Sequence, residues 1–428
     1  MTWSTASLGR AVRLVGGGTP SKKRSDFWGG PIPWVSPKDM GNRDLHDAQD
    51  HISEAAVRES ATQIVPIGSV LIVVRSGILA HRLPVSIARV PVALNQDLKA
   101  LVPGGPLLPE FLAYALEAKA DRILKGCVKR GATVHSVDIG RLQQVPLPIA
   151  APSEQRRIVE ILDQADHLRR LRVEANAKAD RILAALYRKL FLDRASRWPT
   201  ERLGTRLRKT KGALQSGPFG SHLHNSDFVE VGPVLVVGID NVLDGEFSLG
   251  RNRRITAEKY EELKKYTLEP DDILMTIMGT VGRTCVFPRL GEAAICTKHV
   301  YRIQVDERLN PEYVSASIRF APTVRSQLGA AMTGQIVAGL TSDSIRRLEL
   351  AIPPRALQQR FAAHAGTLAQ QRIERRRAAA KLERVFAMLL RDAFSAKLTS
   401  SWRKGHMKEL LQEMEQHSEA LPAPAGTE

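Results

Sequence analysis

The chain has 428 residues, and its 62 Lys and Arg against 45 Asp and Glu give a net charge of +17. This length exceeds what one hydrophobic core usually organises, so it argues against one compact domain and predicts two or three domains of about 150 residues. So basic a chain is attracted to polyanions, which favours nucleic acid as a partner over an anionic membrane surface.

The sequence contains no run of about 20 apolar residues, and its first residues lack the apolar core of a signal peptide. These absences argue against membrane insertion and predict a cytoplasmic protein. The three cysteines, Cys127, Cys285 and Cys296, have no Cys-x-x-Cys spacing. An odd count without that spacing argues against disulfides and zinc knuckles, so we expect buried free thiols and no metal.

The first half of the chain is predicted to alternate short strands, turns and helices. GGPIPWVSPKDM (29–40) predicts a Gly-Pro turn, an apolar strand and a polar exit. Segment 51–77 predicts a short helix, a turn around Pro66, a β-branched strand and a small-residue loop. Pro109 then begins a helix, with Glu110 in the first turn, where a carboxylate is favoured.

A long helix is predicted from Ser153 to about residue 194, because this stretch lacks Gly and Pro and Ser153 can cap its N-terminus. About 40 residues at 1.5 Å each make a rod of roughly 60 Å. Residues at alternating steps of three and four define a heptad seam with one charged interruption. The predicted seam runs through Ile158, Ile161, Ala165, Leu168, Arg172, Ala175, Ala179, Ile182 and Leu186.

The second half repeats the first in the same order, about 202 to 206 positions later, which indicates a two-fold duplication. Segment 231–242 corresponds to 29–40, segment 254–280 corresponds to 51–77, and Pro311 corresponds to Pro109. The phrase that opens the long helix also returns, and a second long helix follows. Its predicted seam runs through Phe361, Ala365, Leu368, Arg372, Arg375, Ala379, Leu382, Phe386 and Leu389.

Two interpretations of the long helices are open: each could lie on its own domain, or their seams could pair. A strict stripe is narrower than a domain-covering face and both helices need a partner of matching length, which favours antiparallel pairing. We predict an α/β (α+β) fold of two similar globular domains with pseudo-two-fold symmetry, separated by two long helices forming an antiparallel coiled coil. The predicted parts are globular domains 1–151 and 196–352, helical regions 152–195 and 353–400, and a tail 401–428 with one short amphipathic helix.

The sequence contains no motif for catalysis or cofactor binding. It lacks a GxxxxGK[ST] loop, a GxGxxG that opens a helix, an HExxH pair and the catalytic elements of DNA methyltransferases, so we predict a non-enzymatic protein without a cofactor. The pair Asp271-Asp272 suits a turn better than a nuclease site. His222, His224 and Asp227 could ligate a metal, although solvent-facing loop histidines are more common.

Several stretches together resemble the DNA specificity subunit of type I restriction-modification systems. They are GGTPSKKRSDFWGGPIPWVSPKDM in the first half, SGPFGSHL in the second, PLPIAAPSEQRRIVEILD and LAIPPRALQQRFAAHAGTL at the two joints, and LTSSWR near the end. The resemblance covers about residues 1–400 and implies two target recognition domains that alternate with two conserved, paired helical regions. The second joint departs from the family pattern, because Gln358 stands where an acidic residue is expected.

The resemblance also implies a function. Such a protein reads a bipartite, asymmetric DNA target and directs adenine methylation, and restriction, by other subunits. Its partners would be double-stranded DNA, two copies of a methyltransferase (modification) subunit and a restriction and translocation subunit. The alternative is a basic coiled-coil scaffold or RNA-binding protein, which would bind nucleic acid without sequence preference.

The candidate DNA contacts are polar or basic residues predicted to lie in loops between apolar runs. In the first half they are Lys22, Lys23, Arg24, Trp28, Lys38, Arg75, His81, Arg82, Lys129 and Arg130. In the second half they are Ser221, His222, Asn241, Arg251, Arg253, Arg254, Arg283, Lys298 and Gln335.

Overall fold

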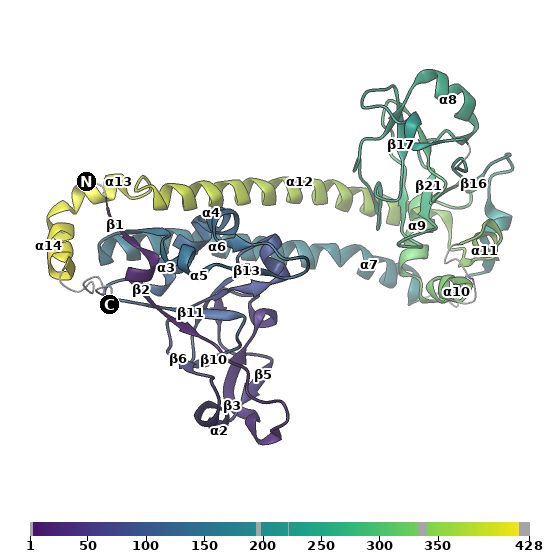
Figure 1. The fold of residues 1–428 in the computed structure, drawn as a ribbon. Coiled ribbons are helices and arrows are strands. Elements are labelled where there is room, and N and C mark those ends of the chain that lie inside the picture. Colours follow the sequence, from purple (N-terminus) through teal and green to yellow (C-terminus); the bar gives the residue numbers. More distant parts are fainter. Residues whose placement is uncertain (1–2, 194–197, 221, 333–339, 419–428) are drawn as a thin grey trace. The chain divides into compact units, whose positions relative to one another are not determined.

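The computed structural model describes residues 3–193, 198–220, 222–332 and 340–418. The chain forms two compact units, unit 1 from residues 1–172 and 379–428, and unit 2 from residues 173–378. Each unit contains a globular part of strands and short helices together with parts of both long helices (Figure 1). Of the helices within the described ranges, none is long and apolar enough to cross a membrane.

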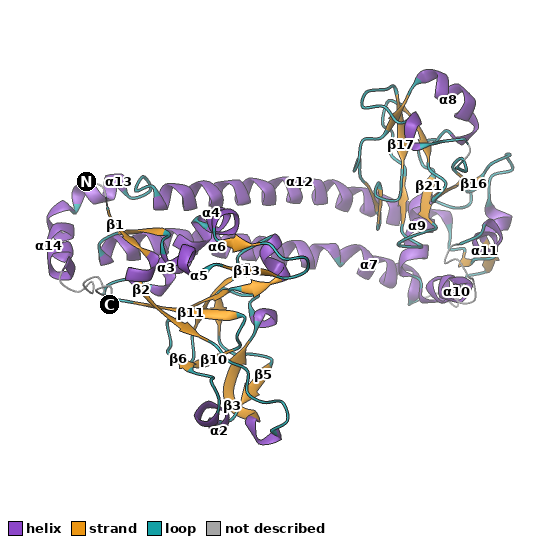
Figure 2. Cartoon of the chain, in the orientation of Figure 1, coloured by secondary structure: helices purple, strands orange, loops and turns teal. Residues whose placement is uncertain are grey.

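The globular part of unit 1 is a mixed α and β structure (Figure 2). Its strands are β1 Ser4–Ser7, β2 Val12–Gly16, β3 Trp28–Val35, β4 Asp44–Leu45, β5 Asp50–Ile52, β6 Ile64–Val65, β7 Val70–Val73, β8 Arg75–Ser76, β9 Val85–Ala88, β10 Val92–Leu94, β11 Leu98–Pro103, β12 Val128–Lys129, β13 His135–Val137 and β14 Pro146–Ile149. Its short helices are α1 Leu8–Ala11, α2 Glu54–Glu59, α3 Pro109–Ala118, α4 Ala120–Gly126 and α5 Ile139–Gln143. The sheets have the orders β2-β11-β7-β9-β4, β5-β3-β10-β6, β12-β13-β8 and β1-β14.

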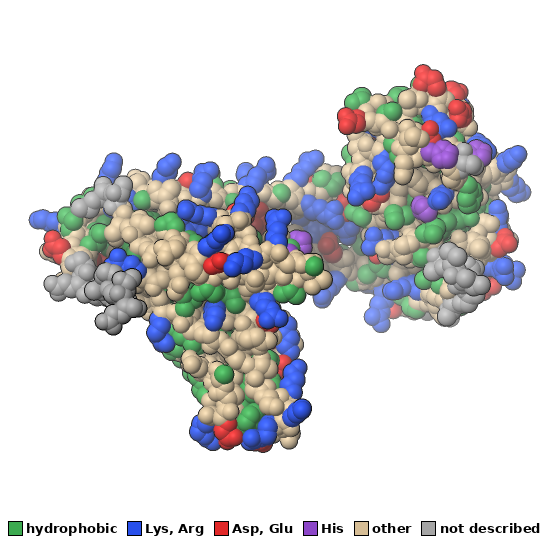
Figure 3. All heavy atoms as spheres, in the orientation of Figure 1, with side chains coloured by type: hydrophobic (Ala, Val, Ile, Leu, Met, Phe, Trp, Pro, Cys, Tyr) green, Lys and Arg blue, Asp and Glu red, His purple; other side chains and the backbone are tan. Residues whose placement is uncertain are grey.

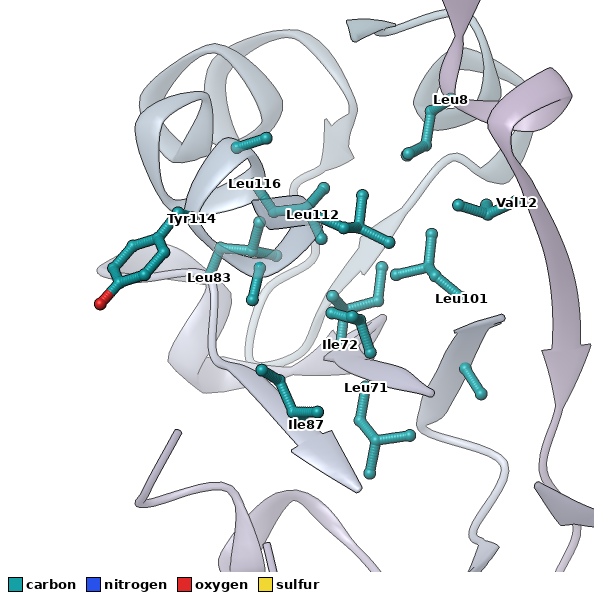
Figure 4. Close-up of a cluster of buried hydrophobic side chains, with 14 of the residues drawn as sticks. Leu8, Val12, Leu71, Ile72, Leu83, Ile87, Leu101, Leu112, Tyr114 and Leu116 are labelled. Atoms are coloured by element: carbon teal, nitrogen blue, oxygen red, sulfur yellow. The ribbon is translucent and has the colours of Figure 1, made fainter. Parts of the chain in front are cut away.

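The core of unit 1 lies between the five-stranded sheet and α3 (Figure 4). Leu71 and Ile72 of β7 and Leu101 of β11 are fully buried, and Leu112 of α3 packs in the same cluster. A continuous apolar run suits a strand that is buried on both faces, as β7 is. Burying each such side chain contributes about 1.5–3 kcal/mol.

The globular part of unit 2 has the strands β15 Thr200–Arg202, β16 Leu214–Ser216, β17 Val234–Val237, β18 Val242–Leu243, β19 Glu246–Phe247, β20 Arg254–Ile255, β21 Ile273–Thr276, β22 Thr284–Val286, β23 Ala293–Cys296, β24 Val300–Ile303 and β25 Glu349–Ala351. Its short helices are α8 Ala257–Leu263, α9 Pro311–Phe320, α10 Pro322–Met332 and α11 Ser342–Arg346. The sheets have the orders β16-β24-β21-β22, β20-β17-β23, β15-β25 and β18-β19.

The two units share one topology, which confirms the predicted duplication. The order β2-β11-β7-β9 in unit 1 matches β16-β24-β21-β22 in unit 2. The strand predicted in 29–40 is β3, which runs parallel to β10, and its counterpart β17 runs parallel to β23. The helices that begin at Pro109 and Pro311 are α3 and α9. The repeated phrases therefore build equivalent strands and helices.

The long helices begin close to the predicted joints. α6 (Pro152–Asp180) is followed by α7 (Ile182–Tyr187) and a π-helical turn at Arg188–Leu192, and α12 spans Arg355–Phe394. Both boundaries between the units fall inside these helices, between residues 172 and 173 and between 378 and 379. The predicted five-part division places its boundaries at the helix ends instead.

The buried face of α12 follows the predicted seam. Phe361, Ala365 and Phe386 are buried, and the remaining seam positions, Leu368, Arg372, Arg375, Ala379, Leu382 and Leu389, are half-buried. Of the predicted seam in the first helix, Ile158 and Ala165 are buried and Ile161 and Leu186 are half-buried.

The first seam prediction was wrong at Leu168, Ala175 and Ile182, which are all exposed, Leu168 and Ile182 to 55% and 48%. The inward positions there are Arg169, Asn176 and Leu183, each one residue further along the chain. Arg169 can face inward because its guanidinium lies over the Phe386 ring, 3.9 Å from the centroid, and pairs with Glu383 at 2.8 Å. Moving a guanidinium out of water costs less free energy when it stacks on an aromatic ring and pairs with a carboxylate than when it has neither partner.

The long helices pair antiparallel within each unit. In unit 1, Arg169 of α6 pairs with Glu383 of α12. In unit 2, Asp180 of α6 pairs with Arg372 at 3.3 Å, and Arg375 donates to the Asn176 carbonyl. The helices also pack on the globular cores, since Ile158 and Phe386 join the unit 1 core and Phe361 joins that of unit 2. The predicted antiparallel coiled coil is therefore confirmed. The alternative, in which each long helix lies on a globular domain, describes the contacts that the paired helices also make with the globular cores.

The Gln358 prediction needs correction. Gln155 of α6 accepts from the Leu108 amide and donates to the Ala150 carbonyl, five residues back. Gln358 makes the same pair of contacts with the Asn310 amide and the Pro353 carbonyl. Gln358 is therefore the counterpart of Gln155, and the acidic residue is replaced by Leu357, which packs against the unit 2 core.

The described part of the tail forms two short helices, α13 (Ser400–Gly405) and α14 (Met407–Ser418), where one was predicted. α13 attaches to the start of α6 through a buried cluster around Glu154, which we call the Glu154 cluster, and Glu413 of α14 accepts from the Ser153 amide at 2.9 Å. Trp3 and Thr399 donate to the Glu154 carboxylate at 2.8 and 2.5 Å, and Arg403 pairs with it at 2.6 Å. The LTSSWR motif thus closes unit 1 by joining both ends of the chain to α6.

Asp272 occupies a buried turn before β21, as expected for a turn residue. Its carboxylate accepts from the Glu269 amide and the Gln304 side chain at 2.7 and 2.8 Å. Burial raises the pKa of Asp272 to about 6. The folded state therefore holds this proton more tightly than the unfolded chain does, so the stabilisation is complete below about pH 4 and is lost as the pH rises through about 6.

We therefore expect Asp272→Asn to flatten the pH dependence of stability. The wild-type free energy of unfolding should fall relative to the variant's by up to about 3 kcal/mol between about pH 4 and pH 7. Urea titrations of both proteins across this range measure the difference. Parallel curves would show that the Asp272 carboxyl group titrates normally.

Candidate nucleic-acid interface

In unit 2, several strands end at one edge of the domain. Thr276 at the end of β21 lies opposite Val300 at the start of β24, and Ser216 at the end of β16 lies opposite Tyr301. The parallel strands β17 and β23 end together at Val237 and Cys296. Residues 217–220, 222–224, 238–253, 277–283 and 297–299 therefore gather there, and we call them the loop edge of unit 2.

Unit 1 has the equivalent edge, formed by residues 17–24, 36–40, 74–82 and 95–97. The Val74 amide donates to the Asp97 carbonyl, and the Asn95 amide to the Val35 carbonyl, both within 2.9 Å. These bonds hold the loops that follow β3, β7 and β10 against one another. We call these residues the loop edge of unit 1.

One glycine in each unit lets the first of these loops approach the sheet. A Cβ on Gly17 would lie 2.0 Å from the Asn95 carbonyl oxygen, and one on Gly217 would lie 1.9 Å from that of Cys296. Only glycine fits at such distances. The stretches VGGGTP and SGPFG therefore share one structural role.

The predicted contacts after β2 differ in their availability. Lys22 and Lys23 are exposed and, within the described part of the chain, form no ion pair. Arg24 pairs with Asp26 at 2.6 Å and Lys38 with Asp50 at 2.9 Å; hydrogen bonds to these carboxylates raise the pKa of each cation. Trp28 is half-buried against Trp34 and donates to the Ser21 carbonyl. Lys22 and Lys23 are thus the freest cations of this loop.

Two predicted cations lie in one row across the sheet β12-β13-β8. Ser136 of β13 is opposite both Lys129 of β12 and Arg75 of β8. Directly opposed residues of antiparallel strands project from the same face, so the three side chains point the same way. Lys129 and Arg75 are 70% and 61% exposed, although each has a carboxylate within 4 Å. Arg130 follows in the exposed turn of this hairpin.

His81 and Arg82 line a hollow of about 620 Å³ in unit 1, together with Arg43, Asp166 and Arg170. In unit 2, Arg283 lines a hollow of about 490 Å³ that also includes Arg319 and Arg325. Each hollow adjoins a loop edge, because Arg82 and Arg283 belong to the loops after β7 and β21. The hollows extend the basic surface from the loop edges towards the helices α3 and α9.

The structure removes several candidates in unit 2. Asn241 is fully buried, where it accepts from the Gly238 amide and donates to the Ser248 and Leu249 carbonyls. It holds the loop in shape and is not a DNA contact, because a buried amide with satisfied hydrogen bonds has no donor for a base. Arg253 and Arg254 are engaged with Asp240 at 2.6 Å and Glu292 at 2.7 Å.

The remaining candidates of unit 2 are accessible or lie outside the described residues. Arg251 and Lys298 are exposed on the loop edge, and His222 is exposed with its backbone amide bonded to the Phe219 carbonyl. Ser221 and Gln335 lie outside the described residues. On the visible face of each unit, Lys and Arg outnumber Asp and Glu (Figure 3).

Sequence reasoning missed Thr19, Gln96 and Ser136. The Thr19 hydroxyl donates to the Gln96 side chain on the loop edge of unit 1. Ser136 lies between Arg75 and Lys129 in the sheet row. Their positions follow from pairing between strands that are far apart in the chain, so no local pattern could have indicated them.

The comparisons with known proteins agree with this arrangement. Residues 2–179 match the family model described as "Type I restriction modification DNA specificity domain". The Escherichia coli EcoR124I/EcoR124II specificity subunit is 42% identical over 167 residues, which cover 39% of this chain. Residues 2–179 are therefore a type I restriction modification DNA specificity domain. The Methanocaldococcus jannaschii MjaIX specificity subunit is 29% identical over 194 residues, or 45% of the chain.

These sequence matches span about two fifths of the relatives, 41% of the E. coli protein and 44% of the M. jannaschii protein. The similarity of fold extends further. The S subunit of a type I system from M. genitalium superposes with a TM-score of 0.53 over 92% of this chain and 96% of its own, at 15% identity. A second structure, from work on type I complex assembly, gives 0.54 over 93% and 98%, at 14% identity. The chain thus has the specificity-subunit fold over nearly its whole length.

Proposed function

We propose that this protein is the DNA-reading subunit of a type I restriction-modification complex. It binds a bipartite, asymmetric target in double-stranded DNA in the cytoplasm, and it directs adenine methylation and restriction by partner subunits without catalysing either. The observation that carries the proposal is the pair of equivalent loop edges, each basic and polar, in a chain that contains a type I restriction modification DNA specificity domain.

The loop edges suit the two parts of DNA recognition. Exposed cations such as Lys22, Lys129 and Lys298 would hold phosphates and fix the register of the domain on the duplex. Side chains that both donate and accept hydrogen bonds, such as Gln96 and Ser136, can read base edges in the major groove, where each base pair shows a distinct pattern. Two such edges in one chain account for a target with two half-sites.

The proposal is tested by co-expressing the chain with its neighbouring methyltransferase and mapping N6-methyladenine across the host genome. We expect one split motif with a fixed gap between two short half-sites. Methylation that is scattered, or that occurs equally without this chain, would contradict the proposal. Methylation of a single continuous motif would show that one unit does not read DNA.

The sheet row makes a specific prediction for unit 1. Arg75→Ala combined with Lys129→Ala is expected to weaken binding of target DNA by roughly 10-fold. It should also reduce the slope of the logarithm of affinity against the logarithm of salt concentration by about one for each lost phosphate contact. Fluorescence anisotropy over a range of salt concentrations measures both. The matched control is Arg10→Ala with Arg13→Ala, two exposed cations of unit 1 outside the sheet row, Arg10 in α1 and Arg13 near the start of β2. Equal losses in both double variants would mean that net charge alone decides affinity.

A further inference from the structure

A second basic surface lies in unit 2, at the far end of the strands from the loop edge. It is a hollow of about 1160 Å³, formed beside the start of β21, the end of β24 and the start of α12. We call it the arginine hollow. Its cationic lining residues are Arg206, Arg208, Lys209, Arg308, Arg346 and Arg355.

Four of these cations have no carboxylate partner among the residues that the structure describes. Arg206 pairs with Glu201 and Asp306, and Arg208 pairs with Glu269 at 3.1 Å. Lys209, Arg308, Arg346 and Arg355 form no ion pair with any residue that the structure describes. The Nη1 atom of Arg355 is buried without a hydrogen-bond partner among those residues. A buried donor left unpaired is costly, so this nitrogen indicates a missing acceptor.

The fold does not require Arg308, Arg346 or Arg355, because unit 1 has the same geometry at these positions without a cation. A Cβ on Gly204 would meet Arg346, and a Cβ on the equivalent Gly9 would meet Gln143. Gln358 donates to the Arg308 carbonyl, and Gln155 donates to that of Pro106. Three residues before these glutamines, α12 begins with Arg355 whereas α6 has Pro152. Arg308, Arg346 and Arg355 therefore have no cationic counterpart in unit 1.

We propose that the arginine hollow binds an acidic segment of the modification subunit. This inference rests on the proposed function, in which DNA occupies the loop edges and partner subunits must dock elsewhere. Asp271, Asp306 and Glu307 also line the hollow. These carboxylates would repel a continuous phosphate backbone, whereas a peptide can place separate carboxylates against the cations and lysines against the acids.

The test compares full-length variants. Arg308→Ala with Arg346→Ala is expected to weaken binding of the modification subunit about 10-fold or more and to lower its salt dependence, with DNA binding by the chain alone unchanged. The matched control is Arg289→Ala with Arg347→Ala, which removes two exposed arginines of unit 2 that do not line the hollow. Calorimetric titration with the purified modification subunit measures affinity, and anisotropy measures DNA binding.

Two results would overturn the inference: affinity for the modification subunit equal in both double variants, or a loss of DNA affinity confined to the hollow variant. If the wild-type chain binds no modification subunit, the proposed function fails instead. The hollow is then tested directly with a labelled poly-L-glutamate peptide. Equal peptide affinity of the wild type and the hollow variant would show that the cations do not form an acidic-peptide site.

Discussion

Glu154→Ala is expected to lower the free energy of unfolding of unit 1 by about 3–5 kcal/mol, the usual effect of removing one partner of a buried ion pair. The Glu154 side chain is 2% exposed and that of its partner Arg403 is 11% exposed. Without the carboxylate, the Arg403 charge and the Trp3 and Thr399 donors stay buried with no acceptor from α6. Urea unfolding followed by circular dichroism measures the loss.

Glu160→Ala is the matched control, because it removes an exposed carboxylate of the same helix whose one ion-pair partner among the described residues is neighbouring Arg157. We expect a change below about 0.5 kcal/mol there. Combining Glu154→Leu with Arg403→Met should cost less than the sum of the single changes, since neither charge is then left unpaired. If the two carboxylate removals are equally mild, the Glu154 cluster does not hold the tail on unit 1.

Phe361→Ala is expected to destabilise unit 2 by about 3–5 kcal/mol, as removal of a buried aromatic side chain usually does. Phe361 is fully buried, and its ring meets those of Tyr187 and Phe191 edge-on at 5.8 and 5.4 Å. These contacts join α12, α7 and the turn that follows α7. The cavity left by alanine would therefore weaken helix pairing and the attachment of the globular part together.

The control for Phe361 is Ile373→Ala on the same helix, because Ile373 is 41% exposed. It should change the free energy of unfolding by less than about 0.5 kcal/mol. Thermal unfolding of both variants measures the difference. If the two substitutions prove equally mild, Phe361 does not anchor α12 to unit 2.

The two units also differ in the charge that the globular part contributes to its ion pairs with the long helices. In unit 1, Arg43 pairs with Glu117 at 2.7 Å and reaches Asp166 of α6 at 4.0 Å. In unit 2, Glu246 pairs with Arg376 of α12 at 2.6 Å. The globular part thus contributes the cation in one unit and the anion in the other.

The predicted seams of the two long helices show which helix contacts can be predicted from the sequence. The second seam followed from periodicity because its polar positions, Arg372 and Arg375, fall among clear apolar ones. In the first helix, Leu168 and Arg169 compete for one position, and hydrophobicity alone selects Leu168. The duplication identifies Arg169 as the seam residue, because it lies 203 residues before Arg372 in the equivalent position. Applying the repeat to the seam would have corrected the prediction.

The candidate site was predictable as loops and not as individual contacts. Loops that are polar and basic follow from composition, and the structure gathers them at one edge of each unit. Asn241, Arg253 and Arg254 looked equivalent to Lys298 in sequence, yet their partners Asp240, Glu292 and the loop carbonyls engage them. Whether a cation is free depends on which carboxylate the fold brings within 4 Å.

The sequence by itself determined the duplication, the order of strands and helices, the two long helices and the resemblance to type I specificity subunits, because these depend on periodicity, turn residues and local sequence motifs. Only the tertiary structure decided the phase of the first seam, the Glu154 cluster, the row Lys129, Ser136 and Arg75, and the unpaired cations of the arginine hollow. Each of these joins residues distant in the chain. Local sequence sets backbone conformation, but which side chains meet is decided by packing between elements, and no short-range pattern contains that information.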